Sequence, residues 1–411
     1  MELGSQKLKF GVWEAGLVLA MLCLIGLGLA SIYSATASQQ TSYLAHNFMR
    51  QIYWAILGTI LFLVTISLHP KFFEATAYLF YGLVLVALLA VLFVGRSGGG
   101  AARWLAIGGF RVQPSEWAKL ATILALARFL ADHHDAVNER KNLLIAAALG
   151  LMPMLLIFKQ PDLGTSLVFI AIVPAMMFWA GVSPLILFLT FLPGITALAS
   201  FQVWSFFLVM LILAVVLFLS QKGLLFSLLH AGLNILVGIV TPSLWNSLEP
   251  YQQKRVLAFV GLVKDPRGIN YQVIQSKVAI GSGGLVGKGF LHGTQTQLRF
   301  LPEQHTDFIF SVIGEEFGFI GGLVVVALFV FLLIRGVQIA ASTKHRFYSL
   351  ASIGIVSLFF YHYFVNLGMV MGIMPVTGLP LPFISYGGSF LLTSMIGVGL
   401  LVNFAMHRQE Y

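Results

Sequence analysis

Apolar runs of about 20 residues alternate with short polar intervals along most of the chain, and this pattern predicts an all-α polytopic membrane protein. Such runs can cross the hydrocarbon core of a bilayer, where lipid offers the backbone no hydrogen-bond partner, so each span should be helical. We expect about 12 transmembrane helices, at residues 12–34, 51–68, 73–94, 115–131, 142–158, 163–180, 184–200, 202–220, 224–241, 308–334, 347–368 and 385–406.

The longest polar interval separates the ninth and tenth predicted spans. It covers residues 242–308 and predicts a large loop before the tenth span. The end of this loop, GSGGLVGKGFLHGTQTQLRFLPEQHTDFIF at residues 281–310, combines glycines, cations, carboxylates and histidines. No Gly/Ser-rich or Pro-rich linker divides the chain, so we expect residues 1–411 to form a single domain.

Of the 411 residues, 58% are hydrophobic and only 9% are charged, which excludes a soluble protein. Cys23 is the only cysteine, which excludes a disulfide framework and a cysteine metal site. The net charge of +9 suits contact with anionic lipid head groups or phosphates. Nucleic acid is a poor alternative, because the cations are scattered between apolar spans and form no soluble basic face.

Lysine and arginine in the short loops predict the orientation, because they are enriched on the cytoplasmic side. Their distribution places both termini in the cytoplasm and loop 242–308 outside it. That loop is itself basic, but it exceeds the length for which the rule holds. Polar groups of the outer segments 95–116, 159–162 and 366–389 could converge with the loop on one vestibule.

Asp307 sits directly against the tenth apolar run. A carboxylate at the mouth of a membrane helix is costly, and its default interpretation is a functional site. The alternative is that Thr306 or Asp307 caps the helix that follows, and placement alone leaves both interpretations open. In the same loop, Lys277 and Lys288 are candidate phosphate ligands, or else solvated lysines.

Charged residues also lie within or beside other spans. Glu116 and Lys119 are three residues apart on one helix face, which predicts an ion pair that faces the bundle interior. A purely structural pair that locks two helices is the slightly favoured alternative. Glu315-Glu316 lies two turns into the tenth span, where at least one carboxylate must face protein. Asp162 follows Pro161 at the start of the sixth span, where an N-cap is favoured over a functional role.

Two outer segments carry further candidates. Arg103 could hold a phosphate in bidentate fashion, and its neighbour Trp104 could be a membrane-interface anchor. Residues 383–389, FISYGGS, follow a Pro-rich turn and include Ser385, and their glycines permit close approach of the backbone.

Four stretches together resemble one family. RWLAIGGFRVQPSEWAK, QPDLGTS, KGFLHGTQTQLRFLPEQHTDFIF and GIMPVTGLPLPFISYGGS occur in the order found in the SEDS family (shape, elongation, division and sporulation), the polytopic peptidoglycan polymerases. Within that family, KGFLHGTQ resembles the KGW-x-x-GTQ signature of the RodA (elongation) branch. Members usually have ten spans, and the surplus here lies between residues 183 and 240.

The resemblance implies a peptidoglycan glycosyltransferase that polymerises lipid II for cell elongation and cell-shape maintenance. It implies a multi-pass protein of the bacterial cytoplasmic (inner) membrane that works with a class B penicillin-binding protein, the transpeptidase. Asp307 falls on the aspartate that the family requires for polymerisation. Glu116, Lys119 and Asp162 fall on its other motif residues.

The predicted mechanism makes Asp307 the general base of glycosyl transfer. The expected substrate-binding residues are Arg103, Trp104, Lys277, Lys288, Glu303 and His305, and the expected supporting residues are Glu116, Lys119, Asp162 and Ser385. No cofactor is certain; a divalent cation, Mg²⁺ or Mn²⁺, is a candidate for stabilising the leaving diphosphate.

Two alternatives belong to other functional classes. A flippase for lipid-linked precursors would suit twelve spans with intramembrane charge, although the chain shows no inverted repeat. A non-catalytic scaffold for the transpeptidase would tolerate Asp307→Ala as long as the complex assembles.

Overall fold

The computed structural model describes residues 11–37, 46–94, 96–98, 101–107, 110–221, 223–245, 253 and 269–409. Each predicted span coincides with one long helix. The helices are α1 (Val12–Ala37), α2 (Asn47–Ser67), α3 (Pro70–Val94), α4 (Pro114–Asp132), α5 (Arg140–Lys159), α6 (Leu163–Trp179), α7 (Pro184–Ala199), α8 (Val203–Ser220), α9 (Leu224–Trp245), α13 (Ile309–Ser342), α14 (Arg346–Val370) and α15 (Gly388–Met406).

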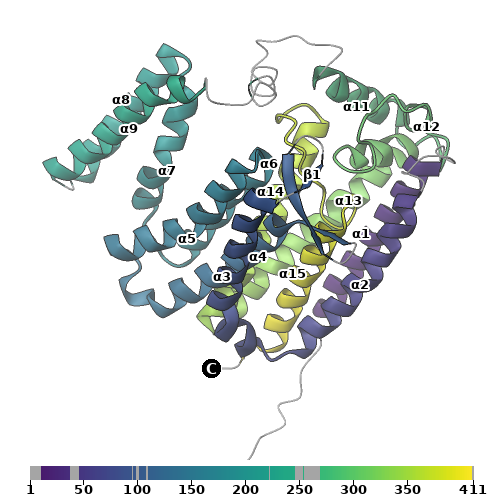
Figure 1. The fold of residues 1–411 in the computed structure, drawn as a ribbon, viewed down its shortest axis with the longest axis horizontal. Helices are drawn as coiled ribbons and strands as arrows, with labels where there is room; N and C mark the ends of the chain where they lie inside the picture. Colours follow the sequence, from purple (N-terminus) through teal and green to yellow (C-terminus); the bar gives the residue numbers. More distant parts are fainter. Residues whose placement is uncertain are drawn as a thin grey trace, which may run out of the picture.

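Within these described ranges, nine helices are long and apolar enough to cross a membrane, while α6 and α7 are apolar but shorter. Most residues of α14 and α15 are buried, because α14 packs against α4, α6 and α13 while α15 packs against α2. These two helices therefore form the centre of the bundle, and α1, α2, α3, α4, α6 and α13 pack around them (Figure 1).

Helices α7, α8 and α9 form a unit that projects from the bundle at the upper left of Figure 1. The unit packs around its own small core of Leu189, Leu192, Leu213 and Leu217. The surplus spans lie in this unit, away from the centre of the bundle.

A three-stranded antiparallel sheet precedes α4. Strands β1 (Arg96–Gly98), β2 (Ala101–Ile107) and β3 (Phe110–Val112) lie in the order β1-β2-β3, and Leu105 faces Val112 in register. The hydrophobic pattern did not predict this sheet, because two of its strands have only three residues. The sheet carries the segment that includes Arg103 to the N-terminal end of α4.

The predicted loop 242–308 is described at residues 242–245, 253 and 269–308, so several of its cations, between residues 254 and 267, lie outside the described residues. The described part contains α11 (Ile269–Gly283) and the single turn α12 (Thr294–Gln297). Both helices lie at the end of the bundle opposite the C-terminus (Figure 1). The described part of the loop is thus folded against the bundle, largely on α13.

Candidate functional site

Asp307 lies at the junction of the loop and α13 and is partly buried. Helix α13 begins at Ile309, and Phe308, which has no polar side chain, occupies the N-cap position. The Thr306 hydroxyl donates to the Glu303 carbonyl oxygen at 3.2 Å instead. Phe308, and not Thr306 or Asp307, therefore occupies the N-cap position of α13.

The backbone around Asp307 is held by three hydrogen bonds, because the carbonyl oxygens of residues 305, 306 and 307 all accept. The donors are the Tyr386 backbone N–H at 3.0 Å, the Ser385 hydroxyl at 2.6 Å and the Asn366 side-chain amide at 3.0 Å. Ser385, predicted as a supporting residue, thus contacts the segment that carries Asp307. Asn366 was not predicted.

The predicted ion pair of Glu116 and Lys119 is present, with 2.7 Å between Oε2 and Nζ and both side chains buried. Lys119 Nζ also lies 3.1 Å from Nε2 of His362, a fully buried residue of α14. His362 was not singled out from the sequence. The sequence could have pointed to His362, because it and Asn366 are polar residues four apart within a predicted membrane span.

Asp162 is the N-cap of α6, as predicted, and its Oδ1 accepts from the Thr165 backbone N–H at 3.3 Å. Arg103 donates to the Pro161 carbonyl oxygen, and its guanidinium lies 3.7 Å from Asp162 Oδ1. Arg103 therefore ties β2 to the start of α6, and its phosphate contact stays a prediction. Trp104 follows on β2 and is partly buried.

Lys288 forms an ion pair with Glu315, with 2.8 Å between Nζ and Oε1. Both Glu315 and Glu316 are buried, so the expectation that at least one faces protein is confirmed for both. Lys288 is thus committed to a side chain of α13. Lys277 is exposed on α11, and in the described part of the chain no hydrogen bond or ion pair of its side chain is found.

Glu303 and His305 lie in the turn before Asp307. Glu303 is exposed and has a left-handed backbone, with φ of 51°. His305 packs beside Tyr386, with ring centroids 5.6 Å apart. Burial lowers the pKa of His305 below its usual 6.5, and the nearby Glu303 carboxylate opposes this only in part. His305 is therefore neutral at pH 7.

Helix α13 is broken at Gly318, where φ is 64° and ψ is −160°. In a regular helix, the N–H groups of residues 319 and 320 would donate to the carbonyls of residues 315 and 316. Here those N–H groups donate to Gly284 and Leu285 at 2.9 and 3.1 Å, while the two carbonyls accept from the N–H groups of residues 288 and 289, both at 3.0 Å. The loop thus satisfies the backbone groups that the break exposes.

Glycines permit this close contact. A Cβ on Gly287, which has φ of 85°, would collide with the Glu316 carbonyl, and one on Gly283 would collide with the Gly314 carbonyl. Gly283 and Gly287 therefore serve backbone packing on α13.

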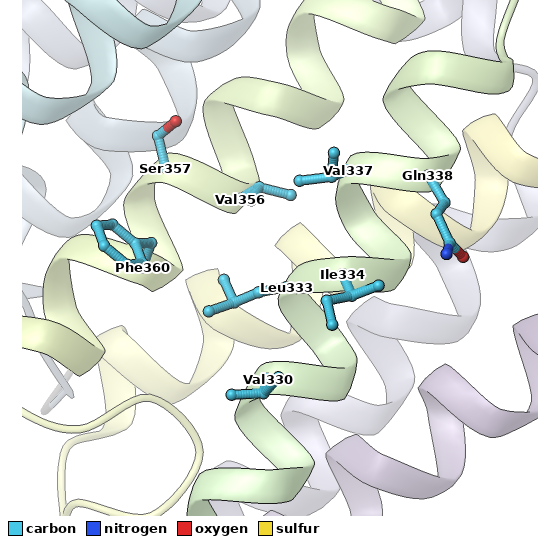
Figure 2. Close-up of a pocket in the computed structure, with 8 residues that line it drawn as sticks. All are labelled: Val330, Leu333, Ile334, Val337, Gln338, Val356, Ser357 and Phe360. Carbon is cyan, nitrogen blue, oxygen red and sulfur yellow. The ribbon is translucent and has the colours of Figure 1, made fainter.

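A separate groove of about 570 Å³ lies between α13 and α14 (Figure 2). It is lined by Val330, Leu333, Ile334, Val337, Gln338, Val356, Ser357 and Phe360. The groove starts about six helical turns beyond the beginning of α13, so it is remote from Asp307. Within the described ranges, no group of three or more His, Cys, Asp or Glu side chains could hold a metal ion.

The family model of FtsW, RodA and SpoVE, described as "cell cycle protein", matches residues 15–209 and 202–410. The chain belongs to this family. The predicted resemblance is confirmed. The two matched segments overlap at residues 202–209, at the start of α8.

Relatives within the FtsW/RodA/SpoVE family include the peptidoglycan glycosyltransferase RodA of Treponema pallidum, 36% identical over 418 residues, which cover 94% of this chain and 96% of the relative. The peptidoglycan glycosyltransferase MrdB of Escherichia coli K12 is 40% identical over 361 residues, which cover 88% of this chain and 86% of the relative.

Two solved structures share this family fold. One, from a peptidoglycan synthase complex described as coordinating polymerization and crosslinking, has a TM-score of 0.72 and 31% identity, and the match covers 97% of this chain and 98% of that one. The other is the rod shape determining protein RodA of Thermus thermophilus, with a TM-score of 0.62, 27% identity and coverage of 96% and 97%. The present chain is accordingly a multi-pass, all-helical membrane protein of this family.

Proposed function

We propose that this chain is a peptidoglycan glycosyltransferase of the RodA branch, which polymerises lipid II into glycan strands during cell elongation. Relatives named as peptidoglycan glycosyltransferases at 36% and 40% identity support this activity. The observation that carries the site is the triple backbone anchor of residues 305–307 at the mouth of α13. Such an anchor holds one carboxylate in a defined place, as general-base catalysis requires.

In the proposed reaction, the Asp307 carboxylate accepts the proton of the 4-hydroxyl group of an acceptor lipid II GlcNAc. The hydroxyl oxygen forms a bond to C1 of the donor MurNAc, and the bond from C1 to the diphosphate oxygen breaks. Undecaprenyl diphosphate leaves with the electron pair, and C1 is inverted.

Cations near the departing diphosphate would stabilise its developing charge. Among the predicted ligands, Lys277 is the cation best suited to this task, because it is exposed and uncommitted in the described part of the chain, whereas Arg103 and Lys288 contact carboxylates. A divalent cation, Mg²⁺ or Mn²⁺, is a further proposal. The described residues include no group of three or more His, Cys, Asp or Glu side chains that could bind this cation. The proposed reaction does not require it.

The proposed setting is the bacterial cytoplasmic membrane, with both termini inside and the loop before α13 outside. The proposed partner is a class B penicillin-binding protein. Support comes from the structural match to a chain of a complex described as coordinating polymerization with crosslinking.

The test is polymerisation of lipid II by the purified complex with its transpeptidase blocked, with glycan strands resolved on a gel. Asp307→Asn and Asp307→Ala should lower turnover by about 10²–10⁴-fold, because a positioned base supplies that much. Asp135→Asn, an exposed carboxylate in the turn between α4 and α5, is the matched control and should retain wild-type turnover.

Each outcome has a distinct meaning. Strands from the wild type and control but not from the Asp307 variants would support the proposal. Strands from all proteins would refute the base role of Asp307. Strands from none, with the complex intact, would favour the flippase or the scaffold.

A further inference from the structure

Two buried polar side chains of α14 have no part in the reaction as described. His362 and Asn366 are both fully buried and lie four residues apart, so they share one face of the helix. Burying such groups is costly unless each finds hydrogen-bond partners. Their partners are therefore informative about what this face of α14 does.

Asn366 uses both hydrogens of its side-chain amide. Its Nδ2 donates to the Leu379 carbonyl oxygen at 2.8 Å and to the Asp307 carbonyl oxygen at 3.0 Å. One side chain thus joins α14 to two segments that are far apart in the sequence, one of which carries Asp307.

His362 also bridges two elements. Its Nδ1 lies 3.1 Å from the Pro380 carbonyl oxygen, and its Nε2 lies 3.1 Å from Lys119 Nζ. The charged ammonium of Lys119 can only donate, so Nε2 accepts and Nδ1 carries the proton, which it donates to Pro380. This assigns the neutral Nδ1–H tautomer and connects the pair of Lys119 and Glu116 to the Pro380 backbone.

The carbonyls of residues 379 and 380 are consequently both held by α14. The chain then turns back, since the Leu381 N–H donates to the Ser385 hydroxyl oxygen at 2.8 Å. That hydroxyl donates in turn to the Thr306 carbonyl oxygen at 2.6 Å. The Tyr386 backbone N–H donates to the His305 carbonyl oxygen. Segment 379–386 is therefore held by α14 at its start and holds residues 305 and 306 at its end.

We propose that His362 and Asn366 are positioning residues that fix the Asp307 backbone for polymerisation, Asn366 directly and His362 through segment 379–386. This inference rests on the proposed function, in which Asp307 is the base. A base must lie within hydrogen-bond reach of the proton it accepts, and a displacement of about 1 Å can cost about 10²-fold in rate. Neither residue contacts substrate in this proposal, so their loss should lower kcat and leave KM nearly unchanged.

Matched variants separate positioning from packing. His362→Phe fills the same space and keeps the stacking on Phe390, whose ring centroid is 4.7 Å away, but it removes both hydrogen bonds. His362→Gln restores one acceptor and one donor. Asn366→Leu removes the amide and keeps the branched shape at a larger volume, and Asn366→Ser is a smaller second variant in case leucine prevents folding.

The assay is lipid II polymerisation by the purified complex, with kcat and KM measured separately and the amount of monodisperse complex used for normalisation. We expect His362→Phe and Asn366→Leu to lower kcat by about 10- to 100-fold at unchanged KM, and His362→Gln to recover most of it. Phe364→Leu alters an exposed side chain of the same helix and should retain wild-type kcat.

Wild-type kcat in both His362→Phe and an Asn366 variant that folds would overturn the inference and leave the proposed function standing. A fall confined to the yield of folded complex, or a rise in KM alone, would also overturn it. If the wild type makes no strands, the proposed function itself fails. An active wild type, together with folded His362→Phe and Asn366→Leu variants of lowered kcat, would support both the inference and the proposed function.

Discussion

At the scale of single residues, Glu315 is a carboxylate that accepts a dense set of hydrogen bonds. Its side chain is fully buried and accepts from five donors. These donors are Lys288 Nζ at 2.8 Å, the N–H groups of Gln295 and Thr296 at 2.9 and 3.0 Å, and the hydroxyls of Thr294 and Thr296 at 3.3 and 2.8 Å. Glu315 therefore organises the GTQ turn from inside α13.

Glu315→Ala should destabilise the protein by about 3 kcal/mol, because it leaves buried donors without an acceptor and Lys288 without a counter-charge. Lys288→Met should cost less than half as much, since Glu315 keeps four other donors. Thermal unfolding in detergent gives both values. Equal losses for the two variants would show that the ion pair, and not the set of turn donors, dominates.

His305 predicts a pH dependence of stability. The pKa of His305 is lower in the folded protein than its value of 6.5 in the unfolded chain. At a pH in the window between these two values, the folded protein therefore binds fewer protons than the unfolded chain. Stability should then rise with pH through the window and fall when the pH is lowered from 7 to 5. His305→Gln should lose less stability than the wild type over this range. Identical melting curves at pH 7 and 5 for both proteins would contradict the prediction.

At the scale of elements, α13 and the loop before it form one hydrogen-bonded unit. The break at Gly318 would leave backbone groups unpaired inside a membrane helix if residues 284–289 did not pair with them. Motion of the loop and of the α13 backbone is thereby coupled. Glu315 lies within this unit, and Asp307 lies two residues before α13 begins.

Gly287→Ala should weaken this unit, because φ of 85° is strained for alanine and the new Cβ would meet the Glu316 carbonyl. We expect a loss of more than about 1 kcal/mol of stability, with a parallel loss of polymerisation. Gly281→Ala is the matched control, since nothing lies within 4 Å of its added Cβ and alanine favours the helix. A Gly287→Ala protein as stable as the Gly281→Ala protein would contradict the steric argument.

At the scale of the whole molecule, the proposed orientation places the two ends of the bundle on opposite sides of the membrane. In the proposed topology the chain crosses the membrane five times between Asp135 and His292, through α5, α6, α7, α8 and α9. Both positions are exposed. Because five is an odd number, this topology predicts that Asp135 and His292 lie on opposite sides of the membrane.

Cysteine labelling tests this arrangement, because Cys23 is the only native cysteine and Cys23→Ala supplies a clean background. His292→Cys should react with a membrane-impermeant maleimide in intact spheroplasts, and Asp135→Cys should react only after permeabilisation. Reaction of both after permeabilisation is the control. Labelling of Asp135→Cys alone in intact cells would reverse the proposed orientation.

The helices could be predicted from local sequence, because the length and polarity of apolar runs are local properties that a bilayer converts directly into spans. All predicted spans are present as helices. The pair of Glu116 and Lys119 and the cap at Asp162 were also predictable, since their partners lie within three residues.

Which distant residues meet depends on how the helices pack, and this could not be predicted from the chain. The sequence offered Lys288 as a candidate phosphate ligand or a solvated lysine, and it gave no sign of its ion pair with Glu315, 27 residues away. His362 and Asn366 look like isolated polar residues in an apolar span until α14 packs against Lys119 and Asp307. Hydrogen bonds between segments depend on helix packing and on close backbone contact at glycines, and neither leaves a periodic pattern in the chain.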